Sequence, residues 1–495
     1  MDPVSAVEEL AVDRTPPVDG DRRGARLARR WLVFGWPAAW GAALGAALFL
    51  VARDAMPDDG LISLSFARNL AEHGQWAITT GIETNTATSP LNVWMLAALH
   101  IATGYRAVVA AAVLLCVSLA LVGLGLRRLG GAPAAVLGPA LLATSPVFTS
   151  SLGLETYLAA AVLVWLLVQA AEGRWSTAGV LVGASYLARP DLVIPAVVVV
   201  LVLAVTSRRR LLLALPLGAA VVAPWVLFSW VHFGSAWSNS VAVKWANGSW
   251  GGETLTVPGY WWGTFPGPAL TIAATLVAGG VAVAVAAWRR QWDAAAIGLG
   301  GAAHLGALAC TETPPIEYYL GPSIAGLATA LLLVTARGPR WALAVPTGIL
   351  AGCVVLSVAH GPLWAEGLAP MRQNIATVAE YRAIIAELPT DGVVMGGEIG
   401  SYAFYCQDRV PECHVVDPVL SDPGRVDGLV SRWRRFHPGW EVNYRYYRVP
   451  PPVPVRYRVD LGDPDHQPGD WPITRAPGVH QWGRLSPEPD PMVPR

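Results

Sequence analysis

The chain has 495 residues, of which 54% are hydrophobic and only 14% are charged, and its mean hydropathy is +0.43. A soluble domain carries about 25% charged residues, so this composition excludes an ordinary soluble enzyme and indicates an integral membrane protein. The formal net charge is zero, which removes the electrostatic argument for a nucleic-acid partner. We therefore expect membrane lipids, and no nucleic acid, among the partners.

Apolar runs divide most of the chain into candidate membrane-spanning helices. The tail, residues 1–30, is polar and basic at its end, and the apolar run after it lacks a clear small-residue cleavage site. This pattern predicts a retained first span rather than a cleaved signal. Since a span needs about 20 mostly apolar residues, we predict about eleven spans. They cover residues 31–52, 107–126, 133–151, 156–171, 175–188, 192–206, 211–231, 268–288, 293–310, 318–335 and 341–359.

Arginine placement predicts the orientation in the membrane. If residues 1–30 are cytoplasmic, every arginine cluster between spans falls on the cytoplasmic side, as the positive-inside rule requires. The agreement depends on the apolar stretch 90–104 not crossing, and that stretch is shorter than a usual span. We therefore expect a multi-pass plasma-membrane protein with a cytoplasmic N-terminus and an extracytoplasmic C-terminal region.

This topology predicts an all-α polytopic membrane domain, residues 31–359, with extracytoplasmic additions. The additions are a first loop, 53–106, a second large loop, 232–267, and a C-terminal region, 360–495. The C-terminal region begins with an amphipathic helical pattern and short strand patterns, which predict a small α/β domain. Its last forty or so residues are Pro-rich, and we expect irregular structure there with one strand, "PVRYRVDL".

Two of the five cysteines lie in the predicted extracytoplasmic C-terminal region. Cys406 and Cys413 are close enough in sequence to form a small-loop disulfide in an oxidising compartment, and two unpaired thiols are an equally good interpretation. The other three, Cys116, Cys310 and Cys353, lie in apolar runs, where we expect inert packing residues.

An acid pair, Asp58 and Asp59, follows the first predicted span by a few residues. Carboxylates at a membrane boundary are stable only when they are hydrated, paired or enclosed in a polar cavity. A carboxylate held there is able to act as a general base on a hydroxyl group. The structural alternative is a hydrated helix terminus, with one acid as the N-cap of the helix that follows.

Further charged residues lie on the predicted outer side. Lys244 is the single lysine, and its aromatic and hydroxyl neighbours suit a lipid-linked phosphate, the alternative being an interfacial lysine. Glu155 in "GLET" and both Arg189 and Asp191 in "ARPD" lie at outer ends of spans. An arginine beside an aspartate is often structural, but acids and cations that gather on one face favour a common site.

No soluble-enzyme motif appears in the sequence: there is no P-loop, HExxH, CxxC or GxSxG pattern. His232, His304 and His360 lie apart without ligand spacing. We therefore expect no cofactor and assign no metal ligands.

Several motifs occur in an order that resembles the GT-C superfamily of membrane glycosyltransferases, which use polyprenyl-phosphate-linked sugars. The resemblance covers about residues 55–425 and is closest to actinobacterial arabinofuranosyltransferase-like and mannosyltransferase-like members. Leu61 and Ser65 depart from it, since an aromatic residue and an arginine are common there. The motifs are "DDGLISLSFARNLAEHGQW", "ATSPLNVW", "GLET", "ARPD", "FGSAWSNSVAVK", "EYYLGP", "GGEIGSYAFY" and "VVDPVLSDPG".

The resemblance implies an inverting hexosyl- or pentosyltransferase that moves a sugar, arabinofuranose or mannose, from a polyprenyl-phosphate donor. The acceptor would be a cell-envelope glycan, lipid or protein at the outer face of the membrane, in cell-wall biogenesis. A divalent metal near the acid pair is compatible with the resemblance, although nothing in the sequence requires one. The alternatives are a non-catalytic envelope-assembly protein and a transporter of lipid-linked glycans.

The resemblance also implies a role for each site residue. Asp58 would be the catalytic base, and Asp59 would support it. Lys244 and Arg189 would bind the donor phosphate. The substrate-binding residues would be Glu155, Asp191, Asn239 and Arg68.

Overall fold

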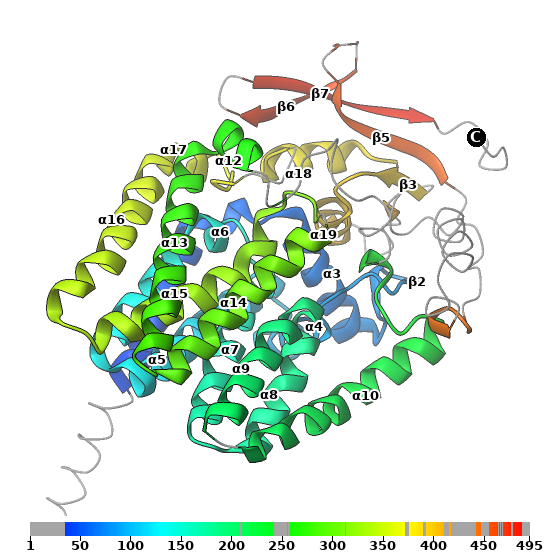
Figure 1. Cartoon of the computed structure of the whole chain (residues 1–495). Helices are drawn as coiled ribbons and strands as arrows, with labels where there is room; N and C mark the ends of the chain where they lie inside the picture. The colour runs from blue at the N-terminus through cyan, green and yellow to red at the C-terminus, as the bar shows by residue number, and fades with distance from the viewer. Residues whose placement is uncertain are drawn as a thin grey trace, which may run out of the picture.

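In this computed structural model most of the chain is a bundle of apolar helices, with a layer of short helices and strands at one end (Figure 1). The described residues are 35–207, 209–241, 255, 258–311, 313–371, 376–389, 393–409, 415–416, 442–446, 455–463, 465, 467, 469–476 and 479–487.

In the part of the chain that the structure describes, ten apolar helices build the bundle, because a chain in lipid must satisfy its backbone hydrogen bonds internally. They are α2 (Trp36–Ala52), α5 (Ala107–Thr144), α7 (Thr156–Ala171), α8 (Trp175–Ala188), α9 (Val193–Thr206), α10 (Ala214–His232), α13 (Pro266–Trp288), α14 (Trp292–Cys310), α15 (Gly321–Ala336) and α16 (Ala344–Ala359). Short helical segments join them: α6 (Pro146–Thr149), η3 (Pro190–Leu192), η4 (Arg209–Leu213), α12 (Pro258–Thr264), η5 (Glu317–Leu320) and η6 (Arg340–Leu343).

Each of the eleven predicted spans has a helical counterpart in the described residues. Two of them fall within α5, which turns at Gly131, where φ is 74°, a conformation that favours glycine. Within the described residues, seven helices are long and apolar enough to cross a membrane, and Pro90–Ala102, Thr156–Ala171 and Pro190–Thr206 are apolar but shorter. The chain is a multi-pass membrane protein.

Small residues let the first helices approach closely, as they do in many membrane proteins. A Cβ atom at Gly41 of α2 would lie 2.3 Å from the carbonyl oxygen of Leu119 in α5. A Cβ atom at Gly123 of α5 would in turn lie 2.6 Å from the carbonyl oxygen of Pro37. Glycines on both helices therefore allow α2 and α5 to pack backbone against backbone.

The first predicted loop contains η2 (Arg53–Ala55), α3 (Asp58–His73), the short strands β1 (Ala77–Thr79) and β2 (Ile82–Glu83), and α4 (Pro90–Ala102). The helix α3 buries Leu61, Leu64 and Phe66 and ends at Gly74, whose φ is 67°. The helix α4 has 13 residues, which is too few to cross a bilayer.

The described part of the C-terminal region carries three helices and a five-stranded mixed sheet. The helices are α17 (Gly361–Ala365), α18 (Val378–Glu387) and α19 (Ile399–Arg409). The strands are β3 (Val393–Gly396), β4 (Val415–Val416), β5 (Val455–Asp463), β6 (Trp471–Ala476) and β7 (Val479–Pro487), in the order β4-β3-β5-β7-β6. β3 is parallel to β4 and β5, and the other pairs are antiparallel.

The expectation of irregular structure with one strand in the Pro-rich tail is wrong, because β6 and β7 follow the predicted strand β5, and β7 lies between β5 and β6 and is antiparallel to both. Trp471, Ile473 and Leu485 supply apolar side chains to these strands and pack against the hydrophobic core. The one proline inside them, Pro472, lies in the edge strand β6, where a missing N–H is tolerated, and Pro487 is the last residue of β7.

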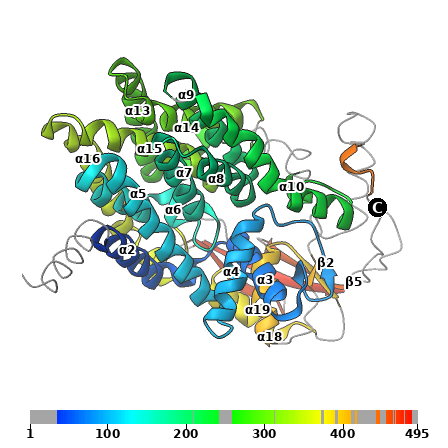
Figure 2. The ribbon, with the colours of Figure 1, turned by 90° about the horizontal axis from the view of Figure 1, so that it is seen from below.

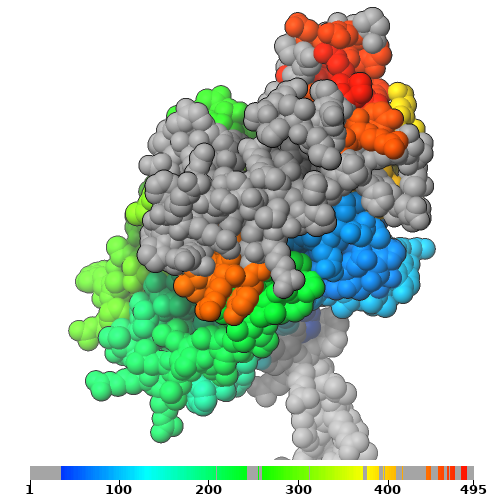
Figure 3. All heavy atoms as spheres, turned by 90° about the vertical axis from the view of Figure 1, so that its right-hand side faces the viewer, coloured from blue at the N-terminus to red at the C-terminus, as the bar shows by residue number. Residues whose placement is uncertain are grey.

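The described residues of this region contact both the first loop and the bundle. The helix α19 packs on α3 (Figure 2), and Gly400 is required there, because a Cβ atom would lie 2.0 Å from the carbonyl oxygen of Asp58. Segment 442–446 lies against the end of α10 (Figure 3), where the Trp230 indole N–H donates to the carbonyl oxygen of Val442. Both contacts lie at the end of the bundle that carries the cavity described next.

Candidate active site

A cavity of about 340 Å³ lies at this end of the bundle, near the low end of the range for small-molecule sites, about 300–1,000 Å³. Its wall comes from α3, the segment 86–89, the start of α7, the turn between α8 and α9, the loop after α10, α14 and η5. The polar residues of that wall are Asp59, Ser63, Thr86, Thr88, Ser89, Glu155, Arg189, Asp191, Ser240, His304, Thr311, Thr313, Tyr318 and Tyr319.

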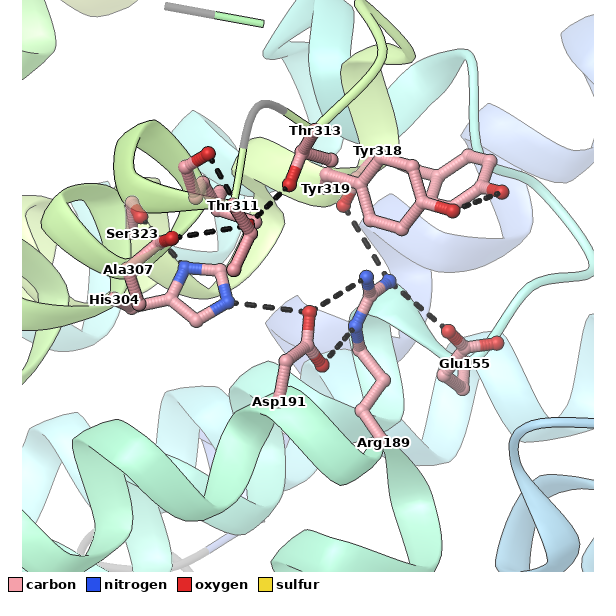
Figure 4. Close-up of polar contacts among 11 residues, drawn as sticks. Glu155, Arg189, Asp191, His304, Ala307, Thr311, Thr313, Tyr318, Tyr319 and Ser323 are labelled. Atoms are coloured by element: carbon pink, nitrogen blue, oxygen red, sulfur yellow. Dashed lines mark hydrogen bonds and ion pairs between the residues drawn. The ribbon is translucent and has the colours of Figure 1, made fainter. Parts of the chain in front are cut away.

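Arg189 is the centre of the polar network (Figure 4). Its Nε donates to Asp191 Oδ1 at 2.9 Å, its Nη2 to Asp191 Oδ2 at 3.0 Å and its Nη1 to Glu155 Oε1 at 3.0 Å. Pro190 explains the geometry, because it disfavours helix at the residue before it, and Arg189 is extended between α8 and η3. The guanidinium is buried, so this fork with two carboxylates compensates its charge.

His304 completes the network on the other side of Asp191. Its Nε2 lies 3.2 Å from Asp191 Oδ2, and its Nδ1 lies 2.8 Å from the hydroxyl of Ser323 (Figure 4). The imidazole is fully buried and belongs to α14, whereas Ser323 belongs to α15. The histidine therefore connects the "ARPD" turn to two helices that are distant in sequence.

Asp59 forms the acid side of the cavity. It is the second residue of α3, where the helix dipole favours a carboxylate. The Tyr318 hydroxyl donates to Asp59 Oδ2 at 2.7 Å. The Arg189 guanidinium carbon lies 5.5 Å from the ring centroid of Tyr318 and 5.4 Å from that of Tyr319. The two tyrosines therefore connect the acid pair to the arginine network.

Unlike Asp59, Asp58 is not part of the cavity wall. Its Oδ1 accepts a hydrogen bond from the backbone N–H of Ser401, in the first turn of α19, at 2.6 Å. Burial, together with the charge of Asp59, raises the pKa of the Asp58 carboxyl to about 7, against hydrogen bonds from Ser401 and Gly400 that lower it. Neither acid is the N-cap of α3, since Pro57 occupies that position.

Hydrogen bonds join two loops at the edge of the cavity. The Asn85 side-chain amide donates to the Ser229 hydroxyl at 3.0 Å and to the Trp237 carbonyl oxygen at 2.9 Å. The backbone N–H of Asn239 donates to the Asn85 carbonyl oxygen at 2.6 Å, and the Ser240 hydroxyl donates to the Thr86 carbonyl oxygen at 2.6 Å. Asn239 thus holds the loop beside the cavity, whereas its neighbour Ser240 lines it.

Several predicted site residues lie elsewhere. Arg68 donates to the carbonyl oxygen of Phe404 at 3.1 Å and to Asp408 at 2.8 Å, so it binds α3 to α19 and does not line the cavity. Lys244 lies outside the described residues. Cys406 is disulfide-bonded, and its predicted partner, Cys413, lies outside the described residues.

Sequence reasoning missed three residues of the network. His304 lies far in sequence from other histidines and has no ligand spacing, and Tyr318 and Tyr319 stand out in the sequence only as part of "EYYLGP". A polar residue in an apolar helix is expensive and often functional, which is the signal that could have found His304.

Within the described residues, no group of three or more His, Cys, Asp or Glu side chains is arranged to hold a metal ion. The described residues therefore supply no set of ligands for the metal that the resemblance allowed, and the mechanism proposed below has no step that depends on one.

No protein-family model and no curated protein sequence matches the chain. Solved structures do match it. ArnT from Cupriavidus metallidurans bound to undecaprenyl phosphate is 14% identical, with a TM-score of 0.53 over 91% of this chain and 98% of ArnT. The oligosaccharyltransferase from Archaeoglobus fulgidus in the apo form is also 14% identical, with a TM-score of 0.53 over 87% of this chain and 70% of its own.

At these identities the likeness establishes the fold. It extends over 91% of the chain for ArnT and 87% for the oligosaccharyltransferase. The chain therefore shares the fold of ArnT and of the Archaeoglobus oligosaccharyltransferase.

Proposed function

We propose that this protein is a membrane glycosyltransferase that moves a sugar from a polyprenyl-phosphate donor to a cell-envelope acceptor. The observation that carries the proposal is the cavity, which gathers Asp59, Glu155, Asp191 and Arg189 from separate elements at one end of a GT-C bundle. Convergent, enclosed ionisable groups in a cleft are typical of a catalytic site.

The structural neighbours support the lipid carrier. ArnT was solved with undecaprenyl phosphate, and the Archaeoglobus oligosaccharyltransferase, with a TM-score of 0.50, was solved with dolichol phosphate. A carrier of this kind reaches the cavity from the bilayer, which gives a reason for a membrane fold. The sugar, arabinofuranose or mannose, and the acceptor rest on the motif resemblance.

In the proposed reaction the acceptor hydroxyl attacks the anomeric carbon of the donor. The bond from that carbon to the phosphate oxygen breaks, polyprenyl phosphate leaves, and a carboxylate takes the hydroxyl proton. The configuration at the anomeric carbon is inverted by this single displacement.

We assign the base to Asp59 rather than Asp58, because Asp59 lines the cavity and Asp58 accepts from α19. The Tyr318 hydroxyl holds Asp59 Oδ2, which orients the carboxylate.

Arg189 is poorly suited to bind the donor phosphate by itself, since each of its three nitrogens already donates to a carboxylate. We propose that it orders Glu155 and Asp191, which accept hydrogen bonds from the sugar hydroxyls. Phosphate stabilisation then falls mainly to Lys244, whose role rests on the motif resemblance.

The arginine clusters favour an orientation in which the cavity faces the outside. Arg128, Arg174 and Arg337 lie at the opposite end of the bundle, where Arg337 donates to Leu129 O and Arg128 and Arg174 share Glu172. The length of α15, 16 residues or about 24 Å, separates Arg337 from Tyr318. With the arginines in the cytoplasm, transfer takes place on the extracytoplasmic side.

Asp59→Asn tests the base assignment. The amide keeps an oxygen for Tyr318 but cannot take the proton, so we expect kcat for transfer from a radiolabelled polyprenyl-phosphate sugar to fall by about 10²–10⁴-fold. Asp58→Asn is the matched control, and we expect it to lose far less. If Asp58→Asn loses more activity than Asp59→Asn, the catalytic base is Asp58. Absence of transfer by the wild type from every such donor would favour a non-catalytic envelope protein.

A further inference from the structure

Two loops form one wall of the cavity, and their side chains join them. Thr86 belongs to the first predicted loop and Ser240 to the loop after α10, which we call the 233–241 loop, and both residues line the cavity. The Ser240 hydroxyl donates to the carbonyl oxygen of Thr86 at 2.6 Å, and the Ser238 hydroxyl donates to the same oxygen at 2.9 Å. The shape of this wall therefore depends on the position of the 233–241 loop.

The membrane domain and the first loop hold the 233–241 loop at Ser235. The Asn85 side-chain amide donates to the carbonyl oxygen of Ser235 at 3.2 Å, and the Ser229 hydroxyl, in the last turn of α10, donates to the same oxygen at 2.7 Å. The Ser235 hydroxyl donates to the carbonyl oxygen of Trp237 at 2.7 Å. Ser229 and Ser235 are buried, and buried polar groups are stable only when they are paired, so these contacts fix the start of the loop.

A residue of the C-terminal region holds the same point from the other side. Asn443 Nδ2 donates to the Ser235 hydroxyl oxygen at 2.9 Å, and Asn443 Oδ1 accepts from the backbone N–H of Ala236 at 2.9 Å. Asn443 is 8% exposed, whereas its neighbour Val442 is 58% exposed. The Asn443 amide is thus buried, and both of its ends bind adjacent residues of the loop.

The helix α10 fixes the segment that carries Asn443. The Trp230 indole N–H donates to the carbonyl oxygen of Val442 at 3.1 Å, and the ring centroids of Trp230 and Tyr446 lie 5.1 Å apart. These contacts hold the segment 442–446 against the end of α10 (Figure 3). The Asn443 amide therefore meets the loop from a fixed position.

We infer that Asn443 is a positioning residue for the proposed transfer reaction, because it holds the 233–241 loop where Ser240 completes the wall of the donor cavity. The inference rests on the proposed function, which assigns the donor to this cavity. Asn443 is not part of the cavity wall, so it acts through the loop. Asp59 and Arg189 belong to other elements, so displacement of the loop should weaken donor binding more than it slows the chemical step.

The test separates donor binding from the chemical step. Transfer from a radiolabelled polyprenyl-phosphate sugar by the full chain in nanodiscs is measured over a range of donor concentrations. Asn443→Ala removes both hydrogen bonds, and we expect KM for the donor to rise about tenfold while kcat changes by less than about twofold. A variant that is merely less stable would lose active protein, which lowers the apparent kcat and leaves KM unchanged.

Two further variants accompany Asn443→Ala. Asn443→Asp keeps an acceptor for the Ala236 N–H but loses the donor to Ser235, so KM should rise less than in the alanine variant, and this variant serves if Asn443→Ala fails to fold. Val442→Ala is the matched control, because it changes an exposed side chain and keeps the carbonyl acceptor of Trp230. Its KM should equal that of the wild type.

Hydrogen exchange with residue resolution tests the positioning without a measurement of activity. The Asn239 N–H donates to Asn85 and not to Asn443, so its exchange reports whether the loop as a whole is held. We expect Asn443→Ala to accelerate exchange of this amide about tenfold. Val442→Ala should leave the rate unchanged.

The outcomes separate the inference from the proposed function. An unchanged donor KM in both Asn443 variants refutes the inference while the glycosyltransferase proposal stands, and a fall in kcat alone refutes it as well. Unchanged exchange at Asn239 also overturns it. If the wild type transfers sugar from no such donor, the proposed function fails, and a role of Asn443 in transfer fails with it.

Discussion

At one end of the helix bundle Arg189 binds two carboxylates inside a cavity, and at the other end Arg174 binds Glu172 near the surface. The side chains of Arg189 and Glu155 are 4% and 5% exposed, whereas those of Arg174 and Glu172 are 60% and 35% exposed. The chemistry of the two pairs is the same, and only the surroundings differ.

The difference shows that the buried network around Arg189 carries a desolvation cost that the exposed pair does not. An exposed pair is screened by water and contributes about 0–1 kcal/mol. A buried network must first lose its hydration, so it is weak evidence for stability. Charged groups retained inside a membrane protein at such a cost indicate function.

Removal of the buried arginine should have the largest effect on stability. Arg189→Met leaves Glu155 and Asp191 without a cation, and we expect a loss of about 3–5 kcal/mol in the free energy of unfolding, measured by denaturant titration in detergent. Arg174→Met is the matched control, with an expected loss of about 0–1 kcal/mol. Equal losses in the two variants would remove the contrast between the ends.

Disruption of the contact between α19 and the acid pair should have the next largest effect on stability. Gly400→Ala places a Cβ atom 2.0 Å from the Asp58 carbonyl oxygen, so α19 must move away from α3. We expect a loss of about 1–3 kcal/mol in the free energy of unfolding, together with weaker transfer activity. Gly397→Ala is the control, since nothing lies within 4 Å of a Cβ atom there. A variant of Gly400 as stable as that control would contradict this docking.

The third prediction concerns the pH dependence of stability. Burial raises the pKa of Asp58 from 3.8 to about 7, so the folded protein holds this proton more tightly than the unfolded chain. This contribution to the free energy of unfolding is therefore present below about pH 4, declines as the pH rises to about 7 and is absent above it.

Asp58→Asn should flatten the dependence of Tm on pH between about pH 5 and 8, because the amide does not titrate. The exposed Asp460 provides the control, and Asp460→Asn should keep the wild-type slope. If Asp58→Asn retains that slope as well, the carboxyl is not the titrating group.

Hydropathy predicted the helices well, because each apolar run in a bilayer must be a helix whatever its neighbours are. Charged motifs next to helix ends were also predictable: Glu155 in "GLET" and the pair in "ARPD" do meet. Their positions at the ends of apolar runs predict that they lie at the same end of the bundle, and the packing of the helices brings their side chains into contact.

Contacts over long sequence distances were not predictable. Arg68 binds Asp408, 340 residues later, and the role of Asp58 depends on Ser401, 343 residues later. His304 belongs to an apolar helix whose own neighbours carry no motif, and its partner Asp191 is 113 residues away. Such residues acquire their roles only from packing, which a single sequence does not reveal.

The most direct measurement is a cryo-EM structure of the full chain in nanodiscs with a bound, non-transferable polyprenyl-phosphate sugar. We expect density for the sugar ring between Asp59 and Asp191, with its hydroxyls at hydrogen-bond distance from Glu155 or Asp191. Density for the sugar outside this cavity, with the Arg189 network unchanged and no sugar beside it, would show that the cavity is not the donor site.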